Sequence, residues 1–401
     1  MRHVFLCLSL LLLGVAVLLP TRSYAELWCA EPVVVHEWGV QVFGTTGAHR
    51  DGAPPLPRHY HNQPARQQAT TTPVRHLPVD GGERELPIVH FYSTGTFTPV
   101  PVGFEVGFTR GEAERWYPQV DRRTPAVDAN GAAALASRNR LIISRTVRLS
   151  APGARTPLPS DPTRQLEWAN LSLTATPQHT RHASELPWVD RLRNLDGALW
   201  VNAATESERF LFYDARTTER PAVTVVRGPT YSAQRHHYLL RNTGTHAVHD
   251  VFLVNRTGAT VSVFYAPSIP AGAHAGFLLE EHRVATDALV AATRGRLRAA
   301  LVDPNAVPPT RGNWGDHCVM QRDPAIPVEH AEGHKLYAPE VDAILEVWAS
   351  RFFDQPGATL LYREDPAYLD TVMPLSIYTD MFHFVQLRRA GLAVQSGVAL
   401  P

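Results

Sequence analysis

Cysteine and lysine are scarce in this sequence, and neither sign of charge is in excess. Three cysteines occur among 401 residues, and no two of them form a Cys-x-x-Cys pair. A redox site of the Cys-x-x-Cys type is therefore excluded. Lys335 is the single lysine, while Lys plus Arg and Asp plus Glu balance at 38 each. A neutral chain gives no electrostatic reason to expect nucleic acid as a partner.

Complete catalytic motifs and late apolar runs are also missing. The sequence has no G-x-S-x-G elbow, no P-loop and no G-x-G-x-x-G after a strand, so three common enzyme signatures are absent. Beyond residue 25, no segment approaches the ~20 consecutive apolar residues that a membrane span needs. We therefore expect a soluble mature chain without a transmembrane segment.

The first 25 residues have the pattern of a secretory signal peptide. Met1-Arg2-His3 precede an apolar block from Val4 to Pro20, and Ser23 and Ala25 are small residues at the minus-three and minus-one positions. A membrane anchor is the alternative, but the block is short for a span of ~20 residues. The pattern predicts cleavage after Ala25 and a periplasmic or secreted protein.

Two cysteines remain after this cleavage, because Cys7 leaves with the signal peptide. In an oxidising compartment Cys29 and Cys318 predict one disulfide bond, and two free buried thiols are the alternative.

Recurrent short strands set the expected fold class. Between residues 141 and 281, strand-like runs alternate with turn residues at a spacing typical of an antiparallel sandwich. We predict a mainly β (α+β) fold with an antiparallel β-sandwich core. Its expected parts are an N-terminal β region (26–120) with a long Pro- and His-rich loop (48–87), a β-sandwich domain (121–281) and a mixed helix and strand α/β unit (282–401).

Local signals place several elements within this plan. Asn242-Thr243-Gly244 and Thr257-Gly258 are typical of hairpin connections. Apolar residues at helical spacing predict one helix over His282–Leu301 and a second that begins with Pro339 in its first turn.

The stretch VVVHEWGVQVFG, residues 33–44, contains the strongest candidate for a reactive site. In a strand, His36 and Trp38 point to one face and Glu37 to the other. His36 is a candidate metal ligand and Glu37 a candidate catalytic base, although adjacent strand positions face one ion only across a bulge. The alternative is a buried strand in which Trp38 packs and His36 bonds a backbone carbonyl.

A second histidine pattern lies in the long loop. His59 and His61 flank Tyr60, a spacing that puts both imidazoles on one face of an extended segment. A zinc or copper site needs three or four ligands, so His36 or His90 would have to complete it through the fold. The alternative is a solvated loop with no ligand role.

Several segments resemble a group of exported bacterial proteins of unknown function that carry a VHEWGTFT-like motif. His36-Glu37-Trp38-Gly39 keeps the first half of that motif, and Val40-Gln41-Val42 departs from the second. Further similar segments are ELPIVHFYS, ERWYPQVD, ERFLFYDA, HDVFLVN and LYAPEVDAILEVWASRFFDQPGATLLYRED. The resemblance implies export and brings no established activity, cofactor or catalytic residue.

Two functions follow from these observations. The first is an exported binding or structural protein that holds an envelope protein or a glycan, with tryptophans 116, 168, 188 and 200 as a candidate sugar platform. Core packing explains these tryptophans equally well. The second is a metal-dependent hydrolase or oxidoreductase that uses zinc or copper at His36, His59 and His61, with Glu37 as base.

Overall fold

The structure, a computed structural model, describes residues 30–44, 54–62, 81–94, 99–121, 164–184, 186–228, 237–278, 284–309, 327–380 and 382–401. The predicted signal peptide, both cysteines of the predicted disulfide and the first strand expected after residue 141 lie outside these ranges. In the described residues the fold is mainly β with packed sheets and added helices, as the sequence predicts.

The largest sheet has nine strands and draws them from all three predicted parts of the chain. Its first five strands, from one edge inward, are β14 (Val284–Ala285), β12 (Thr260–Ile269), β11 (Val248–Thr257), β15 (Gly357–Glu364) and β17 (His383–Ser396). The order continues with β1 (Glu31–Phe43), β2 (Gly82–Tyr92), β8 (Leu211–Thr217) and β4 (Gly111–Tyr117). β1 and β17 run parallel, whereas the other neighbours run antiparallel. The boundaries expected at residues 120 and 281 therefore do not separate sheets.

Two smaller sheets and the helices complete the architecture. One sheet contains β16 (Leu375–Thr379), β3 (Val100–Gly107), β5 (Gln165–Thr174), β6 (Trp200–Ala203) and β7 (Glu206–Glu208). The other contains β13 (His274–Leu278), β10 (His237–Asn242) and β9 (Val223–Arg227). The helices are α3 (Pro187–Arg193), α4 (Thr286–Leu301), α5 (Ala338–Phe353) and α6 (Pro366–Val372).

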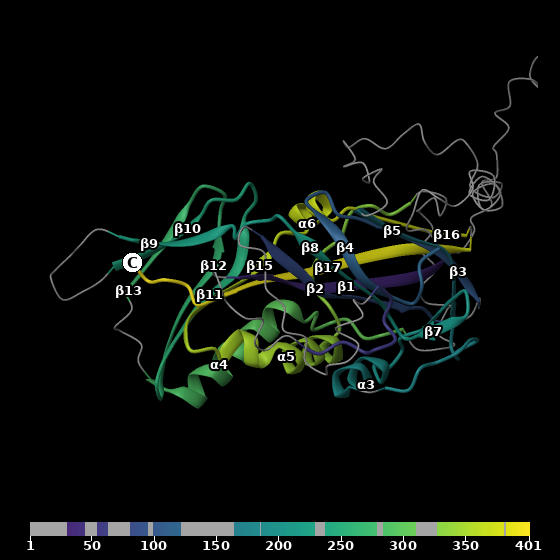
Figure 1. Cartoon of the computed structure of the whole chain (residues 1–401), viewed down its shortest axis with the longest axis horizontal. Helices are drawn as coiled ribbons and strands as arrows, with labels where there is room; N and C mark the ends of the chain where they lie inside the picture. Colours follow the sequence, from purple (N-terminus) through teal and green to yellow (C-terminus); the bar gives the residue numbers. More distant parts are fainter. Residues whose placement is uncertain are drawn as a thin grey trace, which may run out of the picture.

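Strand alternation decides which layer covers which face of the large sheet. Val34 and Trp38 belong to the core that includes α4 and α5, whereas Val33 and Val35 belong to the core shared with the five-stranded sheet. Figure 1 shows α3, α4 and α5 together on one side of the sheet. The large sheet is thus buried on both faces, which explains the long apolar run in β1.

The face away from the helices is covered by two different sheets. At the β11 and β15 end, the three-stranded sheet forms a third core with the large sheet. Figure 1 shows this small sheet at one end of the molecule, with α6 between it and the five-stranded sheet. The change of cover leaves a region beside α6 in which loops, rather than strands, face the large sheet.

Two turn predictions have different outcomes. β11 and β12 form the expected hairpin, with Thr257 paired to Thr260 and Gly258 at a φ of +61°. The hairpin expected at Asn242-Thr243-Gly244 is wrong, because β10 and β11 belong to different sheets. The buried Asn242 side chain holds this connection instead, donating to the carbonyls of His246 and Ile269 at 2.8 and 2.9 Å.

Other boundaries also differ from the predictions. β2 begins at Gly82, inside the loop expected up to residue 87, and α4 begins at Thr286 after the short strand β14. Tertiary pairing overrides the turn signal at Gly82 and the helical spacing at Val284 and Ala285, since a partner strand stabilises an extended segment against its local signal. The second predicted helix is confirmed as α5, with a proline in its first turn.

Two glycines allow close approach between neighbouring strands. A Cβ on Gly39 would lie 3.1 Å from Cα of Pro87, beside the irregularity where Leu86 has a φ of +47°. A Cβ on Gly103 would lie 1.9 Å from the ring of Tyr378 on the neighbouring strand β16. The tyrosine ring therefore covers the position that a side chain would occupy.

Candidate functional site

His36 lies in a closed polar cluster at the start of α5. Its Nδ1 is 2.6 Å from Oε2 of Glu340, and the cross-strand neighbour His90 has Nδ1 3.6 Å from Oε1 of the same carboxylate. The rings of Tyr337 and Tyr92 lie 4.5 and 5.5 Å from the His36 ring, centroid to centroid. His36, His90 and Glu340 are each at most 1 % exposed. The cluster therefore has no opening to solvent.

The charges in this cluster are set by burial and by the single carboxylate. Burial opposes ionisation of Glu340, but His36, His90 and the backbone N–H of Tyr337 outweigh it, so the pKa of Glu340 lies below its ordinary value. Burial lowers the pKa of His90 to about 4, against the opposing effect of Glu340. Because Glu340 is a carboxylate, His36 donates its Nδ1 proton to it. Nε2 of His36 and both ring nitrogens of His90 have no hydrogen-bond partner in the described residues.

This cluster connects three segments that are far apart in the sequence. His36 comes from β1, His90 and Tyr92 from β2, and Tyr337 and Glu340 from the first turn of α5. The same three segments, VHEWG, ELPIVHFYS and LYAPEVD, are among those that carry the resemblance noted above. Glu340 was not predicted as a partner of His36, because its sequence context offers only the helix start at Pro339.

Glu37 points to the opposite face of β1, as strand alternation predicts. Its carboxylate accepts hydrogen bonds from Nε and Nη2 of Arg389, the latter at 3.2 Å, and from the hydroxyl of Tyr213. Burial disfavours charge on Arg389, but Glu37 and Asp370 outweigh it, so the pKa of Arg389 lies above its ordinary value. Glu37 is 2 % exposed. The expected role as a catalytic base does not fit this placement, because both oxygens are occupied and no substrate can approach.

His59 and His61 lie beyond the β4 edge of the large sheet, where their aromatic neighbours Tyr60 and Tyr117 belong to the same core as Trp38. His61 forms a bridge to Trp116 of β4, and its Nε2 is 2.8 Å from Oε2 of Glu206. The ring of His59 stacks on that of His182 at 4.4 Å. Burial lowers the pKa of His59 to about 4, and His182 adds to the effect. Glu206 and His182 were not predicted as neighbours of the two histidines, because both come from distant segments.

The structure does not bring His36 together with His59 and His61, so the metal site expected from these three residues is corrected. The backbone of His61 lies four strand spacings from β1, about 19 Å along the sheet. Ligands of one zinc or copper ion lie about 2 Å from it. Within the described ranges, no group of three or more His, Cys, Asp or Glu side chains is arranged to hold a metal ion.

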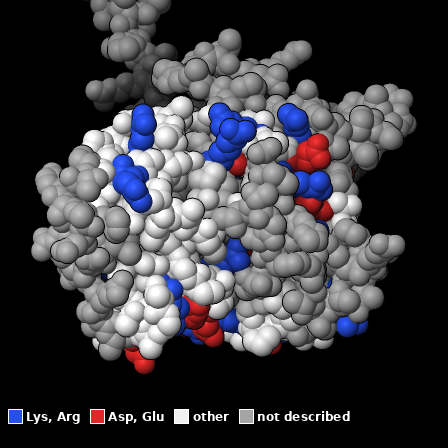
Figure 2. Space-filling model, turned by 60° about the vertical axis from the view of Figure 1, so that its left-hand side comes forward, with Lys and Arg blue, Asp and Glu red and all other residues white. Residues whose placement is uncertain are grey.

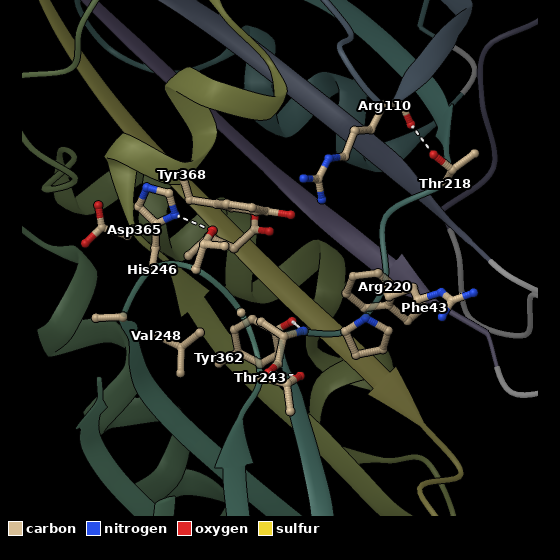
Figure 3. Close-up of a pocket in the computed structure, with 16 residues that line it drawn as sticks. Phe43, Arg110, Thr218, Arg220, Thr243, His246, Val248, Tyr362, Asp365 and Tyr368 are labelled. Atoms are coloured by element: carbon tan, nitrogen blue, oxygen red, sulfur yellow. Dashed lines mark hydrogen bonds between the residues drawn. The ribbon is translucent and has the colours of Figure 1, made fainter. Parts of the chain in front are cut away.

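A pocket of about 340 Å³ lies beside α6, where the cover of the large sheet changes (Figure 3). Five stretches of chain contribute to it: the end of β1, the turn after β3, residues 218–222, residues 243–248, and the end of β15 with the start of α6. Its aromatic walls are Phe43, Tyr362 and Tyr368, and its basic residues are Arg110 and Arg220. A pocket assembled from five distant stretches has no local sequence signature.

The polar groups behind the pocket form a buried network. Arg84 donates to both Glu219 and Glu364, with Nη2 at 2.6 Å from Oε2 of Glu219. The hydroxyl of Tyr368 donates to the same oxygen of Glu219 at 2.7 Å. The pKa of Glu364 lies above its ordinary value, because burial and the nearby Glu219 raise it more than Arg84 lowers it. The backbone N–H of Ala222 donates to the hydroxyl of Tyr362 at 3.0 Å. These bonds fix the two tyrosine rings that face the pocket.

The face of the molecule in Figure 2 shows no single large charged patch that would indicate another binding site. Figure 2 views the molecule from the end that holds the three-stranded sheet, and basic side chains there form several separate groups, some with acidic neighbours. None of the helices in the described ranges has the length and apolar character that crossing a membrane requires.

Comparisons with known proteins do not assign the chain to a family. No protein-family model matches the chain. No curated protein matches it. Among solved structures, the yeast delta-COP-I mu-homology domain complexed with a Dsl1 WxWxV peptide is similar with a TM-score of 0.25 and 9 % sequence identity, over 91 % of this chain and 95 % of that chain. A TM-score of this size carries no argument about fold or function. The fold and site therefore define a class only, a mainly β protein with closed polar clusters and a pocket between its sheets.

Proposed function

We propose that this chain is an exported binding protein of the cell envelope whose ligand occupies the pocket beside α6. The pocket is the observation that carries the proposal. It is lined by aromatic and basic side chains, and its volume of about 340 Å³ is in the range of small-molecule sites. The two best catalytic candidates of the sequence, His36 and Glu37, are closed off from solvent, which favours binding over catalysis.

The signal-peptide pattern of the first 25 residues supports export. N-terminal sequencing of the protein recovered from the periplasm or the medium tests this part. We expect the mature chain to begin at Glu26, and an intact N-terminus on exported protein would contradict the predicted cleavage.

A ligand screen tests the binding function when it compares the unaltered chain with a variant whose pocket is filled by a large side chain. Ala247 lines the pocket and is half-buried, so Ala247→Trp places a large ring in it. Ala271→Trp is the matched control, because Ala271 is exposed in the turn before β13 and does not line the pocket. Thermal melting of both variants first establishes that they fold.

We expect compounds from an envelope-metabolite library to raise the melting temperature of the unaltered chain and of Ala271→Trp. A ligand at 100 times its Kd adds about 2.7 kcal/mol to the free energy of unfolding, enough to detect by this method. Ala247→Trp should show no such rise. A library without any stabilising compound, or equal stabilisation of Ala247→Trp, would contradict the proposal.

A further inference from the structure

We infer that the pocket beside α6 selects a small organic anion, namely a carboxylate or phosphate group carried on an aromatic or cyclic apolar body. This inference rests on the proposed function and adds the chemical class of the ligand. It follows from which polar groups at the pocket are already bonded and which remain free.

The acidic groups at the pocket are all bonded to partners within the protein. Glu364 accepts from Arg84, with Oε1 3.0 Å from Nη2. Asp365 accepts from the backbone N–H of Ala367 at 2.8 Å and lies 3.1 Å from Nε2 of His249. These carboxylates are satisfied in the protein and offer little to a cationic ligand.

Two cationic groups of the lining have no partner in the part of the chain that the structure describes. Arg110 and Arg220 line the pocket, and neither guanidinium has a hydrogen bond or ion pair within the described residues. Figure 3 shows the Arg110 side chain extending from its backbone toward the side of the pocket where Tyr368 lies. Guanidinium groups bind carboxylate and phosphate oxygens through paired, charge-assisted hydrogen bonds. A ligand with an oxyanion group satisfies the donors of Arg110, whereas Arg220 lies apart from it, beside Phe43 (Figure 3).

The walls indicate what the rest of the ligand is. The rings of Tyr362 and Tyr368 are held by hydrogen bonds at their hydroxyls. Tyr368 is half-buried and presents its ring to the pocket, whereas Tyr362 is 2 % exposed and contributes only a small part of its ring to the wall. Val248 and Phe43 add apolar surface, and His246 lies 5.7 Å from the Tyr368 ring, centroid to centroid (Figure 3). Rigid rings favour a flat or cyclic apolar body.

A series of compounds on one ring tests the inference. Benzoate, phenyl phosphate, benzyl alcohol and benzylamine share a phenyl body and differ in charge and head group. Their affinities for the mature chain are measured by isothermal titration at low ionic strength, where charge effects are least screened. The variants are Arg110→Gln and Arg220→Gln, with Arg241→Gln as control, since Arg241 is exposed on β10 and outside the pocket.

We expect benzoate or phenyl phosphate to bind about tenfold or more tightly than benzyl alcohol and benzylamine, and added salt to reduce the difference. Arg110→Gln should weaken binding of the anion about tenfold, the size expected for one charge-assisted hydrogen bond. Arg241→Gln should leave it unchanged. The tighter of the two anions, benzoate or phenyl phosphate, shows whether the pocket selects a carboxylate or a phosphate group.

The outcomes separate this inference from the proposed function. Equal or tighter binding of benzyl alcohol or benzylamine would overturn the anion inference while leaving the pocket as a binding site. Failure of all four compounds to bind would also overturn it, and the screen with Ala247→Trp then decides independently whether the pocket binds anything. An anion that binds equally well to Arg110→Gln, Arg220→Gln and the control would place the anion site elsewhere.

Discussion

Replacing His90 should make the protein less sensitive to acid. His90 is completely buried, and its pKa is about 4 in the folded protein against 6.5 for an ordinary histidine. The unfolded chain therefore binds a proton at this residue more readily than the folded chain does. Between pH 6.5 and pH 4 the free energy of unfolding falls as the pH falls, because protonation favours the unfolded state.

The size of the effect follows from the two pKa values. For one group with pKa values of 4 folded and 6.5 unfolded, linkage gives a loss of about 2 kcal/mol between pH 7 and pH 5. We expect His90→Gln and His90→Phe to remove most of this loss, whatever their stability at pH 7. Other histidines with lowered pKa values remain in every variant, so the difference between variants isolates His90.

Urea unfolding at pH 7, 6 and 5 measures this difference. His330→Gln is the control, because the His330 side chain is 65 % exposed and lies outside the cluster. The control should lose as much stability as the unaltered chain between pH 7 and pH 5. The reasoning is refuted if both His90 variants fold and still lose as much stability as the control.

Three further predictions concern other parts of the structure. Glu37→Gln should lower the free energy of unfolding by about 3–5 kcal/mol, because it leaves the buried Arg389 without its main counter-charge, and a change below ~1 kcal/mol in urea unfolding would contradict this. Gly103→Ala should cost about 1–3 kcal/mol by forcing the covering tyrosine ring away, again measured in urea, and an unchanged midpoint would show that the ring moves freely. For the predicted bond between Cys29 and Cys318, replacing either residue by serine should lower the melting temperature by several degrees, as a loss of ~2–5 kcal/mol requires. Thiol titration of denatured, unreduced protein checks the bond directly, and two free thiols per chain would rule it out.

Local pattern in the sequence was sufficient for many elements of the fold. Alternation in β1 predicted that His36 and Trp38 share one face and Glu37 takes the other, and the cores on the two sides of the sheet agree. The turn at Thr257-Gly258 and the helix that starts near Pro339 depend on nearby residues only, which is why they could be predicted.

Pairing between distant segments could not be predicted from such signals. The parallel ladder of β1 and β17 joins Glu31 to His383, and no local pattern records which strand lies beside which. The expected hairpin at residues 242–244 failed for the same reason, since a turn signal does not say whether the next strand stays in the sheet.

The candidate sites depend even more on distant contacts. The sequence identified His36 as noteworthy, but its partner Glu340 lies 304 positions away and was not considered. The spacing in the sequence predicted that His59 and His61 lie together, but it could not predict the contact of His61 with Glu206, which comes from β7. The pocket is formed by five stretches whose residues are individually unremarkable.

The central position of β1 and β17 in the large sheet has a consequence for how the chain folds. The contact between residues 31–43 and 383–396 closes a loop of roughly 350 residues, and such closure is entropically costly before the contacts it allows are formed. Until residue 396 has left the ribosome, β1 and β15 each lack the strand that separates them, and both have open, apolar edges. The large sheet is therefore completed only after synthesis of its last strand, and until then these two edges are exposed to pairing with other chains.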